Sequence, residues 1–416
     1  MRTDAAISIP RRPNQAPTPA VLWHVAVPRL LEVVFLAVVA IYLAWYIQRF
    51  AVFQGDLRTY LSAAKAVWAG LDPYRPEVLS ELAMRRVMPF VYPPAGILPF
   101  LWLPVFPQPF VMPACMWAKA GLLALLVAHW RRSFPAGSLI PLILVTLYAF
   151  NRAAQWDLSS GNIAILEAAL LFAAFACWAR GRRRAFAALV VAASVFKLAP
   201  AVFLLLLLVP LENSPARPRL LFASVAVVVA LLVLPMWIPP FSHWGSFLVH
   251  APDAVLYGDS NPSSLGFLTA LVSRAGLGSA AVVWVGRALW CVFAVVAVWA
   301  GRQHIRSLWA RRRAMDWIMT AVLLYVLLHP RIMAYGYVLA APAILYFAPR
   351  PFVGRVGLLL WALILSAQGL SQQLTHFASG SLFVLYAPFL FALSAWLSLC
   401  ARSEERPIAG PVPTTA

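Results

Sequence analysis

Acidic residues gather in one polar stretch of this chain, residues 51–94, which directly follows an apolar run at residues 27–47. The whole chain has 14 Asp and Glu residues, and this stretch contains a large share of them: Asp56, Asp72, Glu77 and Glu81. An unperturbed Asp has a pKa of about 3.9, so it is ionised at neutral pH and can accept the proton of a substrate hydroxyl. These carboxylates are therefore the first candidates for acid–base chemistry.

Asp56 opens a segment with the apolar spacing of a helix that lies along a membrane surface. Gly70 then ends the pattern, and a turn follows it. The apolar positions are Leu57, Leu61, Ala64 and Trp68. Asp56 would lie at or near the N-cap, where a carboxylate accepts backbone N–H groups. A capping role and a catalytic role for Asp56 both fit this pattern.

Composition indicates an all-α polytopic membrane protein. The chain has 416 residues, of which 62% are hydrophobic and 11% charged, whereas a soluble domain has about 25% charged residues. Apolar runs extend over the whole length, and helices are the expected spanning structure because lipid cannot satisfy exposed backbone groups. The four cysteines lie in or beside apolar runs without metal or redox spacing, so we interpret them as packing residues.

The net charge of +19 reflects loop topology rather than nucleic-acid binding, because the arginines form short clusters between apolar runs. Basic loops stay in the cytoplasm, so this pattern predicts about twelve transmembrane or half-spanning helices with both termini inside. Residues 27–400 are expected to form one transmembrane domain in the cytoplasmic (inner) membrane. The first apolar run is expected to be retained, and residues 1–26 and 401–416 are expected to be disordered cytoplasmic segments.

The same topology predicts outer loops at residues 51–94, 151–161 and 239–265, and a hairpin of two short helices at residues 185–210. Several apolar runs are too short to cross a bilayer at a rise of about 1.5 Å per residue. Short or broken helices at membrane depth occur where they are buried or line a wet cavity. We therefore expect a cavity that opens to the outer face.

Cations near the outer face are candidates to stabilise a phosphate leaving group. Lys197 lies inside an apolar run, where an ammonium is costly and functional by default, although a snorkelling lysine is the alternative. His329 and Arg331 follow a short apolar run, where interfacial anchoring is the alternative. Arg58 could contact lipid headgroups instead. Glu167 also lies inside an apolar run, and it needs a partner if it is buried.

Two outer segments carry weaker candidates. Asp157 precedes the Gly161 turn and could bind sugar hydroxyls or be an ordinary loop acid. The later loop contains Asp253, Asp259, His243 and His250, which could line an acceptor entrance. Their spacing is not a recognised metal-ligand pattern, so no metal site is predicted.

Residues 55–74 resemble the first outer loop of glycosyltransferase family 87, the bacterial polyprenol-phosphate-mannose-dependent mannosyltransferases of GT-C type. The shared positions are Asp56, Leu57, Tyr60, Gly70, Pro73 and Tyr74. Further motifs of the family follow in order: Tyr92-Pro93-Pro94, Lys197-Leu198-Ala199-Pro200, Asn261-Pro262-Ser263 and His329-Pro330-Arg331, with Tyr335 after the last. Residues 161–164 keep the glycine of the family's Gly-Gln-x-Asn motif but depart from both of its polar positions.

The resemblance covers about residues 50–350, and it implies a GT-C fold and sugar transfer on the periplasmic or extracellular face. The sugar, mannose in the first place, would move from a polyprenyl-phosphate donor to a glycolipid or polysaccharide acceptor. Asp56 matches the acidic base, and direct attack would invert the anomeric configuration. The lipid-phosphate sugar is a co-substrate, so no bound cofactor or metal is implied.

The resemblance and the residue types together assign two sets of binding residues. Donor-phosphate binding is predicted for Lys197, His329, Arg331 and Arg58. Contacts with sugar or acceptor are predicted for Tyr60, Tyr74, Tyr92, Asp157, Asn162, Asn261, Ser263 and Tyr335.

Other classes fit part of the pattern. A lipid-linked sugar flippase or secondary transporter would also have many spans and broken helices, but its key acids are expected within spans rather than in loops. An arabinosyl or other pentosyl transferase, or a surface-polysaccharide polymerase or ligase, is the further alternative. Membrane lipids are expected partners in each case, and nucleic acid in none.

Overall fold

The computed structural model describes residues 19–133, 139–211, 214–241, 243–245, 261–276, 278–347 and 385–404. Helices dominate these residues, and their one isolated β-bridge joins Leu211 and Ser214. The predicted helical membrane protein is thus confirmed. In the part that the structure describes, four helices are long and apolar enough to cross a membrane, or five if one bent pair counts as a single span. The total of about twelve spans stays a prediction.

The chain begins with α1 (Pro19–Phe50), α2 (Gly55–Trp68), α3 (Pro76–Leu82) and α4 (Gln108–Ser133). The central helices are α5 (Leu139–Ser160), α6 (Ala164–Ala179), α7 (Arg183–Phe196) and α8 (Pro218–Val233). The later ones are α10 (Ser264–Arg274), α11 (Ser279–Ala300), α12 (Arg302–Arg311), α13 (Ala314–Leu328), α14 (Ala340–Phe347) and α18 (Ala387–Glu404). Short 3-10 helices connect them, including η2 (Pro94–Phe100), η4 (Ala199–Leu208) and η7 (Ala334–Leu339).

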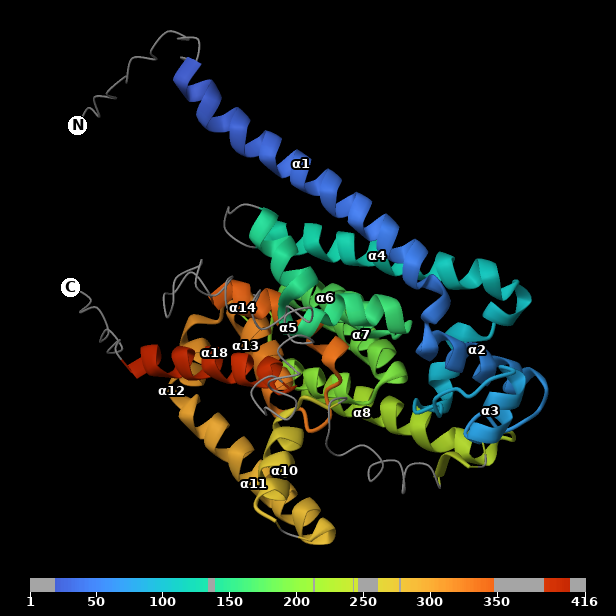
Figure 1. The fold of residues 1–416 in the computed structure, drawn as a ribbon. Coiled ribbons are helices and arrows are strands. Elements are labelled where there is room, and N and C mark those ends of the chain that lie inside the picture. The colour runs from blue at the N-terminus through green and yellow to red at the C-terminus, as the bar shows by residue number, and fades with distance from the viewer. Residues whose placement is uncertain are drawn as a thin grey trace, which may run out of the picture.

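The first polar stretch folds at one end of the molecule, where α2 and α3 lie (Figure 1). The predicted surface helix is present as α2, and its apolar residues pack with those of α3 and η2 into a separate core cluster that includes Leu61, Leu79 and Phe90. The larger core cluster lies between α5, α6, α7, α13 and α14. Residues 94–105 form 3-10 turns rather than a regular α-helix.

A sharp bend joins α5 to α6 and corrects one predicted loop. Residues 151–160 are helical, so the outer loop predicted at 151–161 is reduced to Gly161, Asn162 and Ile163. The segments Arg152–Ser160 and Ala164–Ala179 meet at 118°. Gly161 makes the bend with a φ of +76°, a left-handed conformation that glycine adopts without a Cβ penalty. A broken helix of this kind places backbone and polar side chains at the same point.

We expect Gly161→Ala to lower both stability and activity. A Cβ at Gly161 would lie 2.7 Å from Leu57 Cβ and 2.9 Å from Gln54 Cβ, so α2 would have to move. The left-handed backbone alone costs about 1–2 kcal/mol for an L-residue. Thermal unfolding in detergent measures the loss. The matched control is Gly121→Ala in α4, where an added Cβ meets nothing within 4 Å, and equal unfolding temperatures for the two variants would contradict the prediction.

Several predicted boundaries change or fall outside the described residues. Helix α1 begins at Pro19, so residues 19–26 are helical rather than disordered, and α18 continues through residues 401–404 of the predicted tail. The hairpin predicted at residues 185–210 is present as α7 followed by η4. The remaining termini, most of the loop at 239–265 with Asp253, Asp259 and His250, and the span predicted at 356–370 lie outside the described residues.

Candidate functional site

Asp56 lies in the first turn of α2, one residue inside the helix and near its N-cap as expected, but it does not take the capping role that the sequence left open. The N-cap residue is Gln54, and no side chain caps this helix. The Asp56 carboxylate instead accepts a hydrogen bond of 2.8 Å from Nδ2 of Asn162, which lies at the bend between α5 and α6. The Asp56 side chain is partly exposed. It is therefore held by a neutral donor while one side stays open to a ligand.

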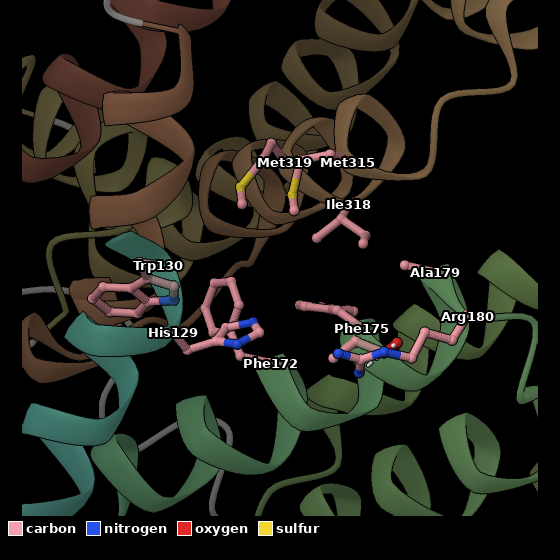
Figure 2. Close-up of a pocket in the computed structure, with 10 residues that line it drawn as sticks. His129, Trp130, Phe172, Phe175, Ala179, Arg180, Met315, Ile318 and Met319 are labelled. Atoms are coloured by element: carbon pink, nitrogen blue, oxygen red, sulfur yellow. Dashed lines mark hydrogen bonds between the residues drawn. The ribbon is translucent and has the colours of Figure 1, made fainter. Parts of the chain in front are cut away.

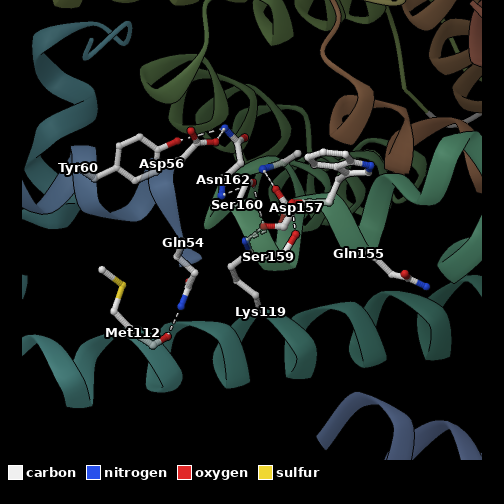
Figure 3. Close-up of polar contacts among 12 residues, drawn as sticks. Gln54, Asp56, Tyr60, Met112, Lys119, Gln155, Asp157, Ser159, Ser160 and Asn162 are labelled. Carbon is white, nitrogen blue, oxygen red and sulfur yellow. Dashed lines mark hydrogen bonds and ion pairs between the residues drawn. The ribbon is translucent and has the colours of Figure 1, made fainter. Parts of the chain in front are cut away.

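Asn162 links the carboxylate to two buried tyrosines and one cation. Figure 3 shows Asn162 next to Asp56 and Tyr60. Its Nδ2 donates to the hydroxyls of Tyr92 at 3.0 Å and Tyr60 at 3.2 Å, and the Tyr60 hydroxyl donates to that of Tyr92 at 2.8 Å. Its Oδ1 accepts from Lys197 Nζ at 3.4 Å. The neighbours determine this amide orientation, because a carboxylate only accepts hydrogen bonds and an ammonium only donates them.

Lys197 lies in the break between α7 and η4, and its extended backbone ends α7. Its Nζ forms an ion pair of 3.0 Å with Glu167 and lies 5.2 Å from the centre of the Tyr335 ring. Tyr325 of α13 forms a further side-chain hydrogen bond with Glu167. The side chain of Lys197 is 24% exposed and that of Glu167 is 7% exposed, so the lysine is the more accessible member of the pair and the glutamate is buried.

His329 and Arg331 form a turn just beyond the end of α13. The backbone N–H of Arg331 donates to Nδ1 of His329 at 3.0 Å, which leaves the proton of the neutral ring on Nε2. Burial, followed by the positive charges of Lys197 and Arg331, lowers the pKa of His329 to about 4. His329 therefore offers a neutral N–H donor at pH 7 and not the positive charge considered from the sequence.

The Asn261 and Ser263 motif supports this turn from behind. Ser263 Oγ donates to the Pro330 carbonyl at 2.7 Å and Asn261 Nδ2 donates to the same oxygen at 3.4 Å. Both side chains are fully buried. Tyr337 adds a bond of 2.7 Å to the Pro262 carbonyl. Asn261 and Ser263 therefore hold the His329 turn in place, and they lie beneath the exposed side chains.

Asp157 is also buried, on the opposite side of the bend from Asp56. Its Oδ2 lies 2.9 Å from Lys119 Nζ, and its Oδ1 accepts from the Ala164 N–H at 2.8 Å. Asp157 thus caps α6 and neutralises a lysine of α4, which places it in the support of the bend rather than in the exposed outer loop where the sequence placed it.

Tyr74 and Arg58 lie apart from the cluster around Asn162. The Tyr74 hydroxyl donates to the Tyr92 carbonyl at 2.8 Å, and its ring packs on Trp244 at 5.1 Å. Arg58 Nη2 donates to the Val52 carbonyl at 2.7 Å on the outside of α2. Direct contacts and electrostatic interactions therefore join one cluster of residues: Asp56, Tyr60, Tyr92, Asn162, Lys197, His329, Arg331 and Tyr335.

The surroundings of Asp56 raise its pKa above the ordinary value for an aspartate. Burial is the largest cause of the increase, and the hydrogen bond from Asn162 opposes it by stabilising the charged form. The charge of Asp157 raises the pKa further, whereas Lys197 and Lys119 lower it. A base must be ionised to accept a proton, and a raised pKa makes the ionised carboxylate a stronger acceptor.

We expect Asn162→Leu to move the acid limb of the activity profile to higher pH. The substitution removes the hydrogen bond that favours the carboxylate, so the pKa of Asp56 rises further and the base stays protonated over a wider range. Initial rates measured across pH give the position of the limb. Ser160→Ala is the control, since Ser160 Oγ contacts only backbone groups, the N–H of Asn162 and the carbonyl of Asp157. An acid limb that stays in place would contradict the role of Asn162.

Three supporting residues had weak signals in the sequence. Lys119 is a lone lysine in an apolar run, and the argument that identified Lys197 would have found it as well. Glu167 was recognised as needing a partner, and that partner is Lys197. Tyr325 looks like any aromatic residue of an apolar helix, and only the fold shows its contact with Glu167.

The family model of glycosyltransferase family 87 matches residues 90–330, which is more than half of the chain. The match includes the bend at Asn162, Lys197 and the start of the His329 turn, whereas Asp56 lies before it. Searches of the curated proteins and of the solved structures give no match. The matched region contains half of the residues in the polar cluster, and the chain belongs to glycosyltransferase family 87, a family of membrane glycosyltransferases.

Proposed function

We propose that this membrane glycosyltransferase moves one sugar from a polyprenyl-phosphate donor to a glycolipid or polysaccharide acceptor. The reaction occurs on the outer face of the cytoplasmic membrane, with the basic ends of the helices inside. Mannose is the first candidate for the sugar. The observation that carries the proposal is the pairing of a carboxylate and an ammonium through one amide, since Asn162 contacts Asp56 by Nδ2 and Lys197 by Oδ1.

In the proposed reaction, Asp56 acts as the general base. The acceptor hydroxyl gives its proton to the Asp56 carboxylate as its oxygen bonds to the anomeric carbon of the donor sugar. The bond from that carbon to the phosphate oxygen breaks, and the electron pair leaves with the lipid phosphate. One direct displacement inverts the configuration, so a β-linked donor gives an α-linked product.

Lys197 and the His329 turn meet the charge that develops on the leaving phosphate. The side chain of Lys197 is partly exposed, and the Nε2–H of His329 and the guanidinium of Arg331 lie on the adjoining turn. Donors that are already oriented toward the developing charge stabilise the transition state without reorganisation. The glutamate beneath Lys197 keeps the lysine charged before the donor arrives, and no step in this reaction requires a metal.

Three tyrosines of the cluster are proposed to have two roles: Tyr335 contacts the sugar, and Tyr60 and Tyr92 hold Asn162 in place. Tyr60 and Tyr92 are buried and their hydroxyls are hydrogen-bonded, so their role is to fix Asn162. Tyr335 is partly exposed and can contact sugar or acceptor. Asn261, Ser263, Asp157 and Tyr74 support this arrangement from behind.

The direct test is a donor panel. Membranes containing the protein are incubated with radiolabelled polyprenyl-phosphate mannose, glucose, galactose and arabinose, and with the corresponding nucleotide sugars, and labelled lipids and polymers are separated. We expect transfer from one lipid-phosphate sugar, and an inverted anomeric configuration in the product by NMR. Transfer from a nucleotide sugar alone would contradict the donor class, and retention of configuration would contradict direct displacement.

A further inference from the structure

A cavity lined by polar and apolar side chains lies toward the end of α6 that is far from Asp56. It has a volume of about 180 Å³ and lies between α4, α6 and α13 (Figure 2). Phe172, the first residue of α6 that lines the cavity, follows Asn162 by ten residues, which corresponds to about 15 Å of helical rise. The cavity is therefore distinct from the proposed catalytic cluster.

The walls of this cavity combine aromatic and aliphatic side chains with a few polar groups. Phe172 and Phe175 of α6 face Met315 and Met319 of α13, and Arg180 lies at the rim. Methionine and phenylalanine walls suit a flexible hydrocarbon chain. A free inorganic anion would gain nothing from such walls, so the lining favours a ligand with a charged head and an apolar tail.

One wall carries a buried hydrogen-bond donor without a partner. Trp130 of α4 is 0% exposed, and its Nε1 has no acceptor among the described residues. Its indole nitrogen lies on the cavity side of the ring in Figure 2. An unsatisfied buried N–H is costly, so an oxygen acceptor that reached Nε1 from the cavity would satisfy a donor that has no partner among the described residues.

One arginine, Arg180, lines the rim of the cavity, and further arginines lie near it outside the lining. Arg180 and Arg132 both lie within electrostatic range of His129, and Arg313 directly precedes α13. Asp316 is the acid nearest in sequence, but its carboxylate accepts a hydrogen bond from Tyr346 of α14 and it does not line the cavity. Arg183 is buried and bonded to Ser214 at 2.9 Å, so it belongs to the helix packing.

We propose that this cavity binds one anionic phospholipid. The phosphate lies at Arg180 and its cationic neighbours, an ester or phosphate oxygen accepts from Trp130 Nε1, and the start of an acyl chain packs on Phe175 and the two methionines. Basic pockets between transmembrane helices on the cytoplasmic side bind anionic headgroups in this way. The site is independent of the proposed sugar transfer, because it requires neither donor nor acceptor.

Native mass spectrometry of the purified protein tests the proposal without an activity assay. Phosphatidylglycerol and phosphatidylcholine are added at equal concentrations, and retained lipid is counted. We expect wild type to retain one phosphatidylglycerol in preference, and Arg180→Gln to bind it about fivefold more weakly, which corresponds to about 1 kcal/mol for one basic contact. Arg184→Gln is the matched control, because Arg184 is exposed and outside the cavity.

A second variant removes the space rather than the charge. Ala176→Phe places a ring in the cavity, and we expect it to reduce phosphatidylglycerol retention while Arg180 and the rest of the rim remain. Equal retention of both lipids by wild type would overturn the proposal, and this comparison needs no variant to fold. Equal weakening by the Arg180 and Arg184 substitutions would also overturn it. Displacement by inorganic phosphate or by a polyprenyl phosphate would assign the cavity to a different ligand.

Discussion

Asp56→Asn reduces sugar transfer by at least about 100-fold, in the range by which a general base contributes to rate. The change is nearly isosteric, and Asn162 Nδ2 can still donate to the remaining oxygen, so folding and membrane insertion are retained. The amide has no capacity to take a proton from the acceptor hydroxyl. Donor binding rests on other side chains, and the loss is therefore expected in kcat with little change in the KM for donor.

Asp72→Asn is the matched control for that result. Asp72 lies in the same polar stretch, where it accepts a hydrogen bond of 2.8 Å from the Tyr74 N–H and contacts His243. Both variants lose one negative charge from this stretch, but only Asp56 lies at the Asn162 bend. Transfer is measured in membranes at matched protein levels. Full activity in Asp56→Asn would refute the assignment of the base, and equal losses in both variants would point to a general effect of charge.

Local patterns predicted much of this fold because membrane helices can be recognised from their apolar composition. The apolar spacing after Asp56 predicted α2, and Pro200 beside Lys197 predicted the break after α7. The interval at 151–161 was misassigned because its polar residues resemble a loop, whereas Asp157 and Asn151 belong to a helix that turns sharply at Gly161. A helix interior with polar residues cannot be separated from a loop when its partners, such as Lys119, are far away in the sequence.

The site was predictable as a set of residues but not as an arrangement. Lys197 was identified because a charge in an apolar run is costly, and Asp56 because a carboxylate can accept a proton. The fold brings both residues to Asn162. The buried positions of Asn261 and Ser263 could not be read from their types, because the same amide and hydroxyl could bind a sugar or a backbone carbonyl. The neutral state of His329 likewise depends on burial and on Lys197, which lies distant in sequence.

Lys197→Met reduces transfer by about 100-fold or more, since the loss of one group that stabilises developing charge costs about 10²–10³ in rate. The same substitution leaves Glu167 buried without its ion-pair partner, and a buried unpaired charge costs about 3–5 kcal/mol of stability. A low activity in this single variant therefore has two explanations. Measuring activity together with thermal unfolding in detergent detects both effects but does not separate them.

The double variant Lys197→Met with Glu167→Gln separates the two explanations. Glu167→Gln removes the unpaired carboxylate and keeps an acceptor for Tyr325, so the unfolding temperature is expected to recover toward wild type. Transfer is expected to stay low, because the ammonium that faces the lipid phosphate is still absent. Recovery of both stability and transfer would mean that Lys197 only compensates for Glu167. Recovery of stability alone assigns the charge of Lys197 to the reaction, because the neutralised pair then supports the fold but not the leaving phosphate.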